Sequence, residues 1–240
     1  MKHFAFILVL TFLASACHQK QEKKTVTKLP LLQASSEIKK SNHPFANINL
    51  YDDLNNELIL DTLEYNRDAQ FSPLYIGDLK DDIKLTYKIS KLKHGTSLDF
   101  NYVTPKSSDF TIFIDTTKTI GFPVSMFEHY KKAEYRTNKK SYPVFIKNKS
   151  ADTLHIGLGD ILYMRTEAQD TTGNWQEIER DHIYFCGTGL RSFYLNPNQI
   201  AVTALRQNYG RYKTKFRIRF GNLEHKIYSN EIDGYLDFEL

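Results

Sequence analysis

Cys186 and His182 are residue types that could together support nucleophilic chemistry. They stand four positions apart, so both side chains would lie on one face of a β-strand. A thiol becomes a nucleophile when a nearby base or positive charge lowers its pKa. The surrounding residues 183–187 are mostly apolar, and a lone cysteine in such a run is more often a small buried hydrophobic residue. We therefore expect Cys186 to be inert and the protein not to be an enzyme.

Two pairs of acidic residues have the composition of a glycosidase site, in which one carboxyl group donates a proton and the other acts as base or nucleophile. Glu177 and Glu179 are two positions apart and would share one strand face, and Glu167 precedes Asp170 by three positions. A solvated strand face carries the same pattern. We interpret both pairs in that way, which leaves a hydrolase as the least favoured function.

Metal ions, cofactors and nucleic acids are ligands that the sequence argues against. His129, His155, His182 and His225 stand apart along the chain and lack metal-ligand spacing. No glycine-rich loop opens a helix that could hold a phosphate. The formal net charge is +4 over 240 residues, and the basic residues are dispersed apart from residues 211–219. We therefore expect no metal, no cofactor and no nucleic-acid partner.

Aromatic side chains offer a binding hypothesis. Exposed tyrosine and tryptophan can stack on sugars or anchor a protein partner. The candidates in the C-terminal region are Trp175, Tyr184, Tyr194, Tyr209 and Tyr212. We prefer to interpret the single tryptophan as a core or hairpin residue rather than as a platform for a ligand. Many of the tyrosines must also fill the core.

The N-terminus has the organisation of a bacterial export signal. Lys2 and His3 are followed by residues 4–13, which are apolar apart from one threonine and too short to span a membrane as a helix. Residues 13–17, Leu-Ala-Ser-Ala-Cys, resemble a lipobox. The resemblance implies a signal peptide over residues 1–16 and a lipidated Cys17 at the mature N-terminus.

A lipidated Cys17 would hold the protein on a membrane, because each buried methylene group contributes about 0.8 kcal/mol. It would also leave Cys186 without a disulfide partner in the chain. Residues 17–46 are polar, and we expect the lipidated cysteine to be followed by a disordered tether. We expect an outer-membrane location, and the sequence leaves open whether the protein faces the periplasm or the cell surface.

The rest of the chain is rich in short strand patterns. Residues 83–89 alternate between apolar and polar, and Gly173 lies in a hairpin turn signal. A helix is conceivable only in residues 44–61 and 124–135. We predict an all-β fold of two antiparallel β-sandwich domains of immunoglobulin-like type. The predicted domains are residues 47–125 and 141–240, joined by a charged link.

Several segments of the C-terminal region resemble a group of uncharacterised lipoproteins from Flavobacteria and related Bacteroidota. These segments are residues 142–148, 167–170, 173–179, 185–187 and 228–231. The resemblance implies a lipoprotein with a C-terminal immunoglobulin-like region, and it implies no activity.

Three functions follow from these patterns, in decreasing order of preference. The first is a non-enzymatic envelope lipoprotein that binds a partner protein or has a structural role. The second is a glycan-binding surface lipoprotein, and the third is a hydrolase.

Overall fold

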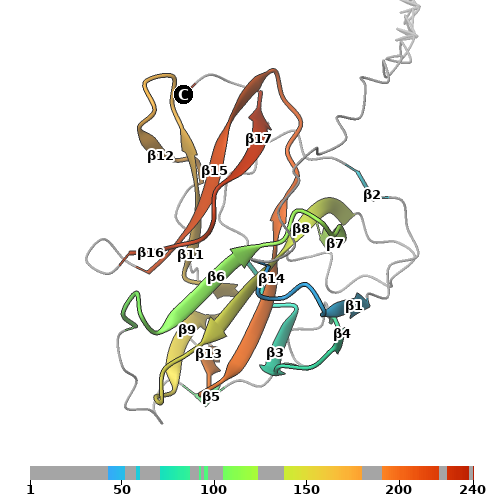
Figure 1. Cartoon of the computed structure of the whole chain (residues 1–240), viewed down its shortest axis with the longest axis vertical. Helices are drawn as coiled ribbons and strands as arrows, with labels where there is room; N and C mark the ends of the chain where they lie inside the picture. Colours follow the sequence, from blue (N-terminus) through green and yellow to red (C-terminus); the bar gives the residue numbers. More distant parts are fainter. Residues whose placement is uncertain are drawn as a thin grey trace, which may run out of the picture. The chain divides into compact units, whose positions relative to one another are not determined.

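A computed structural model describes residues 43–51, 58–59, 71–86, 92, 95–96, 105–123, 138–179, 191–221, 226–237 and 240. These residues form strands, turns and loops, without a helix among them, which confirms the predicted all-β fold (Figure 1). The described ranges accordingly contain no helix that is long and apolar enough to cross a membrane. In the two segments where a helix was conceivable, residues 49–51 and 58–59 are strands, and 124–135 lie outside the described residues.

Most of the described strands are short, as the turn-forming residues between the apolar runs of the sequence predict. In chain order they are β1 (Asn49–Tyr51), β2 (Leu58–Ile59), β3 (Tyr75–Asp78), β4 (Asp82–Lys84), β5 (Gly95–Thr96), β6 (Phe110–Ile114), β7 (Ile120–Pro123), β8 (Asn138–Asn148), β9 (Leu154–Leu158), β10 (Ile161–Leu162), β11 (Met164–Gln169), β12 (Trp175–Glu177), β13 (Arg191–Leu195), β14 (Gln199–Arg206), β15 (Tyr212–Phe220), β16 (Ile227–Tyr228) and β17 (Ile232–Leu236).

A six-stranded sheet contains β8 and β14 as its long central pair. The sheet order is β2-β8-β14-β3, and β6 and β7 also pair with β8. In β8, Val144, Phe145 and Ile146 are all completely buried, although adjacent side chains of a strand point to opposite faces. Val144 and Ile146 belong to one hydrophobic cluster and Phe145 to another. The sheet is therefore covered on both faces, which explains its continuous apolar runs.

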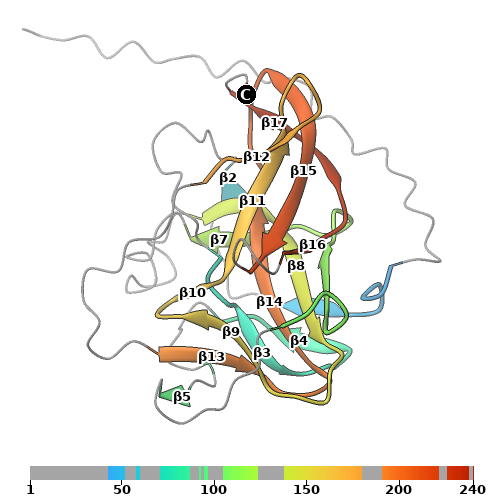
Figure 2. The same ribbon diagram turned by 90° about the vertical axis from the view of Figure 1, so that its left-hand side faces the viewer.

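Two further sheets pack against one face of the six-stranded sheet. The four-stranded sheet has the order β10-β9-β13-β5, and the five-stranded sheet has the order β12-β11-β15-β16 with β17 also pairing β15 (Figure 2). Buried residues from all three sheets form the larger hydrophobic cluster. The opposite face of the six-stranded sheet packs against residues 45–48 and the parallel pair β1-β4.

The predicted division between residues 47–125 and 141–240 does not separate the sheets. From the first region, β3 pairs with β14, β6 and β7 pair with β8, and β5 pairs with β13. The larger hydrophobic cluster also contains residues from both regions. The two regions therefore form shared sheets rather than two independent sandwiches. Local periodicity located the strands but carried no information about these long-range partners.

The end of the predicted tether, residues 43–46, is packed against the folded body. Phe45 is buried and stacks on Phe145 with ring centroids 4.7 Å apart. Nε2 of His43 lies 2.9 Å from Oδ1 of Asp115, and Nζ of Lys118 donates to the carbonyl oxygen of Phe45 at 3.4 Å. The prediction of a tether through residue 46 is thus wrong for these positions, because an aromatic anchor and two polar contacts fix them. Residues 17–42 lie outside the described residues.

Candidate functional site

The strand register brings a set of charged and aromatic side chains together on the outward surface of the five-stranded sheet. In β15, Phe216, Ile218 and Phe220 point into the core, so the residues between them point outward. We call this outward surface the cation–aromatic face. Its residues are Arg165, Glu167 and Gln169 of β11, Trp175 and Glu177 of β12, Lys213, Lys215, Arg217 and Arg219 of β15, Tyr228 of β16, and Asp233 and Tyr235 of β17.

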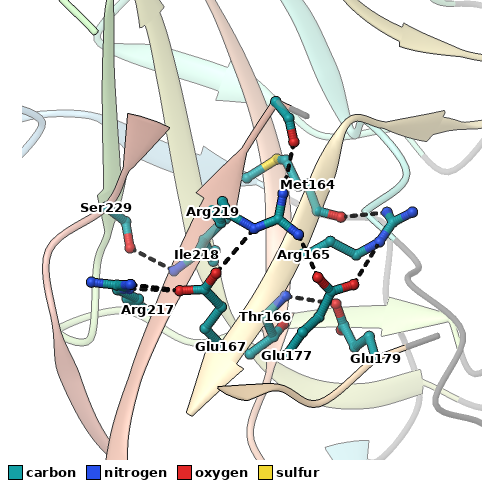
Figure 3. A network of polar contacts seen from close by, with 11 residues as sticks. Met164, Arg165, Thr166, Glu167, Glu177, Glu179, Arg217, Ile218, Arg219 and Ser229 are labelled. Atoms are coloured by element: carbon teal, nitrogen blue, oxygen red, sulfur yellow. Dashed lines mark hydrogen bonds and ion pairs between the residues drawn. The ribbon is translucent and has the colours of Figure 1, made fainter. Parts of the chain in front are cut away.

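Glu167 lies at the centre of the polar network on this face. Its Oε2 accepts a hydrogen bond from Nε of Arg217 at 2.8 Å, and its Oε1 accepts one from Nε of Arg219 at 3.0 Å (Figure 3). Nη2 of Arg217 also lies 2.7 Å from Oε2. Glu167 and Arg219 are only 7% and 6% exposed. Such buried charges are stable only when they are paired and hydrogen-bonded, as they are here.

Glu177 extends the network to the next strand. Nη2 of Arg219 donates to Oε2 of Glu177, and Nε of Arg165 lies 3.3 Å from Oε1. Nη1 of Arg219 donates to the carbonyl oxygen of Gly221 at 2.9 Å. Arg219 therefore connects two carboxylates from two strands, and Figure 3 shows Glu177 between Arg219 and Arg165.

The guanidinium group of Arg217 lies against two aromatic rings. Its central carbon is 4.1 Å from the ring centroid of Trp175 and 3.8 Å from that of Tyr228. A planar guanidinium group stacks well on aromatic faces while its N–H groups bind a carboxylate at the edge. The stack holds β12, β15 and β16 together through their side chains. Arg217 therefore covers one face of the Trp175 ring, and a ligand could not stack on that face.

The lysines at the N-terminal end of β15 are exposed to solvent. The side chains of Lys213 and Lys215 are 61% and 47% exposed, and their Nζ atoms lie 3.6 Å and 2.6 Å from carboxylate oxygens of Asp233. The hydrogen bond from Lys215 is the main reason why the pKa of Asp233 is lowered. Two exposed lysines thus share one carboxylate, and the positive charge of this end is only partly balanced.

Glu177 and Glu179, the sequence-predicted acid pair, have separate partners. Glu177 binds arginines, whereas Oε2 of Glu179 accepts a hydrogen bond from the backbone N–H of Thr166 at 2.8 Å. Burial raises the pKa of Glu179 to about 7, against the opposing effect of that hydrogen bond and of Arg165. Both acids are engaged by the protein itself, which supports a structural role for them.

The other sequence-predicted acid pair, Glu167 and Asp170, is divided in the same way, and the prediction of a solvated strand face is wrong for Glu167, which is buried between two arginines. Oδ1 of Asp170 accepts hydrogen bonds from the backbone N–H groups of Thr172 and Asn174, each at 2.9 Å. The hydrogen bond from the Thr172 hydroxyl is the largest contribution that lowers the pKa of Asp170 to about 2. This carboxylate organises the hairpin turn between β11 and β12, where Gly173 has a φ of 87°.

The sequence-predicted aromatic candidates are not brought into one site. Trp175 lies on the cation–aromatic face, whereas Tyr194 stacks on His155 of the four-stranded sheet with ring centroids 5.1 Å apart. Tyr209 and Tyr212 are exposed just before or at the start of β15. Tyr184 lies outside the described residues, as do Cys17, Cys186, His129, His182 and His225.

Arg217 and Tyr228 were missed by sequence reasoning about binding. The strict alternation over residues 213–219 contained a usable signal, because it places a basic residue at every outward position. Tyr228 had no comparable signal, since its pairing with Arg219 depends on tertiary register.

His155 is the described member of the four histidines considered as metal ligands. Its Nε2 lies 3.4 Å from the hydroxyl oxygen of Tyr163, and burial lowers its pKa. Within the described ranges, no group of three or more histidine, cysteine, aspartate or glutamate side chains could hold a metal ion. The cation–aromatic face is therefore the strongest candidate site. No known protein family, curated protein sequence or solved structure matches the chain.

Proposed function

We propose that this protein is a non-enzymatic binding module of the bacterial cell envelope, and that it binds its partner through the cation–aromatic face. One observation carries the proposal: the cations of this face exceed its carboxylates, and each carboxylate is already paired. The cations are Arg165, Lys213, Lys215, Arg217 and Arg219, and the carboxylates are Glu167, Glu177 and Asp233.

The part of the face around Arg217 is held in place by several contacts, which supports this role. Arg217 is fixed by Glu167 at its edge and by Trp175 and Tyr228 on its ring-facing sides. Binding costs less free energy when the interacting side chains are already ordered in the unbound protein. The exposed lysines next to this fixed part are the groups that would meet a ligand first.

The proposed location follows from the N-terminus. A lipid on Cys17 would attach the mature chain to the outer membrane, and a tether would join it to the folded body. The described part of the chain begins at His43, and Phe45 is anchored in the core. The tether would then allow the cation–aromatic face to reach a partner away from the lipid surface.

Site-specific photo-crosslinking in living cells tests this function. A benzophenone amino acid replaces Lys213 on the cation–aromatic face, and in the control it replaces Tyr51 of β1, which is 54% exposed on a different sheet. We expect a crosslinked product from position 213, seen as a discrete band for a protein partner or a high-mass smear for a polymer, and none from position 51. Equal products at both positions, or none at position 213, would count against binding through this face.

A further inference from the structure

We infer that the ligand of the cation–aromatic face is an acidic polysaccharide, because this face carries exposed lysines and, about 13 Å further along β15, an exposed tyrosine whose ring is held by a fixed arginine. The inference rests on the proposed function above and specifies the class of its ligand. Lys213, Lys215 and Tyr228 are the residues assigned to ligand contact, and Arg217 is assigned to positioning.

The composition of the face favours a hydrated ligand over a folded protein partner. Along the described residues of β11, β12, β15, β16 and β17, no aliphatic side chain occupies an outward position. The largest aromatic residue of the face, Trp175, is already covered on one side by Arg217, so the face lacks the cluster of free apolar anchors that the centre of a protein interface buries. A surface of lysine, arginine and tyrosine instead matches a ligand with charged groups and hydroxyl groups at its surface.

The spacing of the cations suits a polymer with repeated negative charges. Lys213 and Lys215 occupy successive outward positions of β15, about 7 Å apart, and both are exposed, whereas the next two outward residues, Arg217 and Arg219, are bound to Glu167. The two lysines at the exposed end share the single carboxylate of Asp233. A ligand carboxylate can therefore bind a lysine here without leaving a buried protein acid unpaired.

Tyr228 supplies a surface for a sugar ring. It remains 39% exposed while the guanidinium group of Arg217 lies 3.8 Å from its ring centroid. This contact fixes the plane of the phenol ring, so a sugar that stacks on it loses little additional protein freedom. An acidic sugar chain long enough to extend along β15 could place its anionic groups at the lysines and one ring on Tyr228.

Binding of the full-length, detergent-solubilised protein to defined polysaccharides tests the inference. The probes are polygalacturonate, alginate and hyaluronate, each measured by calorimetry, with fully methyl-esterified polygalacturonate as a neutral counterpart. We expect at least one acidic polymer to bind and to weaken as salt screens the charges. The neutral polymer should bind at least about tenfold more weakly.

Matched variants locate the interaction on the face. K213Q/K215Q should weaken binding by about tenfold, whereas K80Q/K106Q removes the same charge from exposed positions elsewhere and should leave binding unchanged. Y228A should weaken binding and Y228F should retain it, because the phenyl ring is preserved. Circular dichroism would verify that each variant is folded.

Several results would overturn the inference. They are an absence of binding to all three acidic polymers, equal binding to the methyl-esterified polymer, and equal losses in the two double variants. Binding to anionic phospholipid vesicles in place of the polymers would assign the face to lipid headgroups. If crosslinking from position 213 still captured a discrete protein, the binding function would stand and only the polysaccharide assignment would fail.

Discussion

Glu167 and Arg217 face each other across β11 and β15, with Nε of the arginine 2.8 Å from Oε2 of the glutamate. The same arginine stacks between Trp175 and Tyr228. One ion pair therefore joins the charged and the aromatic parts of the surface. Its effect on the free energy of unfolding can be measured separately from the effect of this surface on partner binding.

Replacing Glu167 by glutamine should strongly destabilise the fold, because Arg217 loses its charged partner and Arg219 loses one of its two carboxylates. Breaking a buried ion pair typically costs about 3–5 kcal/mol, and we expect roughly 3 kcal/mol in the free energy of unfolding. Urea denaturation measures this change. Asp233→Asn is the matched control, because its exposed pairs should contribute less than about 1 kcal/mol. Similar costs for the two substitutions would contradict the central role of Glu167.

Gly173→Ala should destabilise the turn between β11 and β12 by about 1 kcal/mol, because Gly173 has a φ of 87°. No atom lies within 4 Å of the added methyl group, so the effect is conformational rather than steric. Gly173→Asn should cost less, since asparagine tolerates this backbone conformation better. Thermal denaturation of both variants gives the comparison, and an alanine variant as stable as the wild type would refute the explanation.

Glu179 should make stability fall as pH rises from about 4.5 towards 7. Burial raises its pKa in the folded protein to about 7 from the ordinary value of 4.5. In this window the folded protein retains a proton that the unfolded chain has released, so higher pH favours unfolding. Glu179→Gln cannot ionise and should remove this contribution.

The measurement for Glu179 is the difference in unfolding free energy between wild type and Glu179→Gln across this pH range. Using the difference cancels the opposite contribution of His155, whose lowered pKa favours the folded state as pH rises through the same window. A constant difference from pH 4.5 to 7 would show that folding does not raise the pKa of Glu179.

Lipidation of Cys17 should be visible by mass spectrometry of the protein from its native membrane. We expect a mature chain that begins at Cys17 and carries acyl chains. The Cys17→Ser variant should leave the membrane fraction, because the two-chain anchor is lost. An unmodified cysteine, or a Cys17→Ser variant that still sediments with membranes, would remove the proposed anchor.

The all-β class and several individual strands were predictable, because their signals are local. Residues 214–220 alternate between apolar and polar, and the structure buries Phe216, Ile218 and Phe220 while the intervening side chains point outward. The turn at residues 170–174 was equally predictable from Asp170 and Gly173. These features depend on backbone preference and on side-chain alternation within a few residues.

The arrangement of the strands was not predictable in the same way. β6 and β8 are separated along the chain by β7, yet all three meet in one sheet. The ring contacts of Arg217 involve Trp175 and Tyr228 from two other strands, and no spacing rule connects these positions. The site therefore depends on register between strands, which a single sequence does not encode in any local pattern.

Charge reversal combined with crosslinking tests the central claim most directly. A benzophenone amino acid at Tyr235, on the cation–aromatic face, reports partner capture in cells carrying K213E/K215E. We predict that the crosslinked product disappears in this variant and persists in the control K80E/K106E. A product of undiminished yield in K213E/K215E would show that the partner does not bind through these cations.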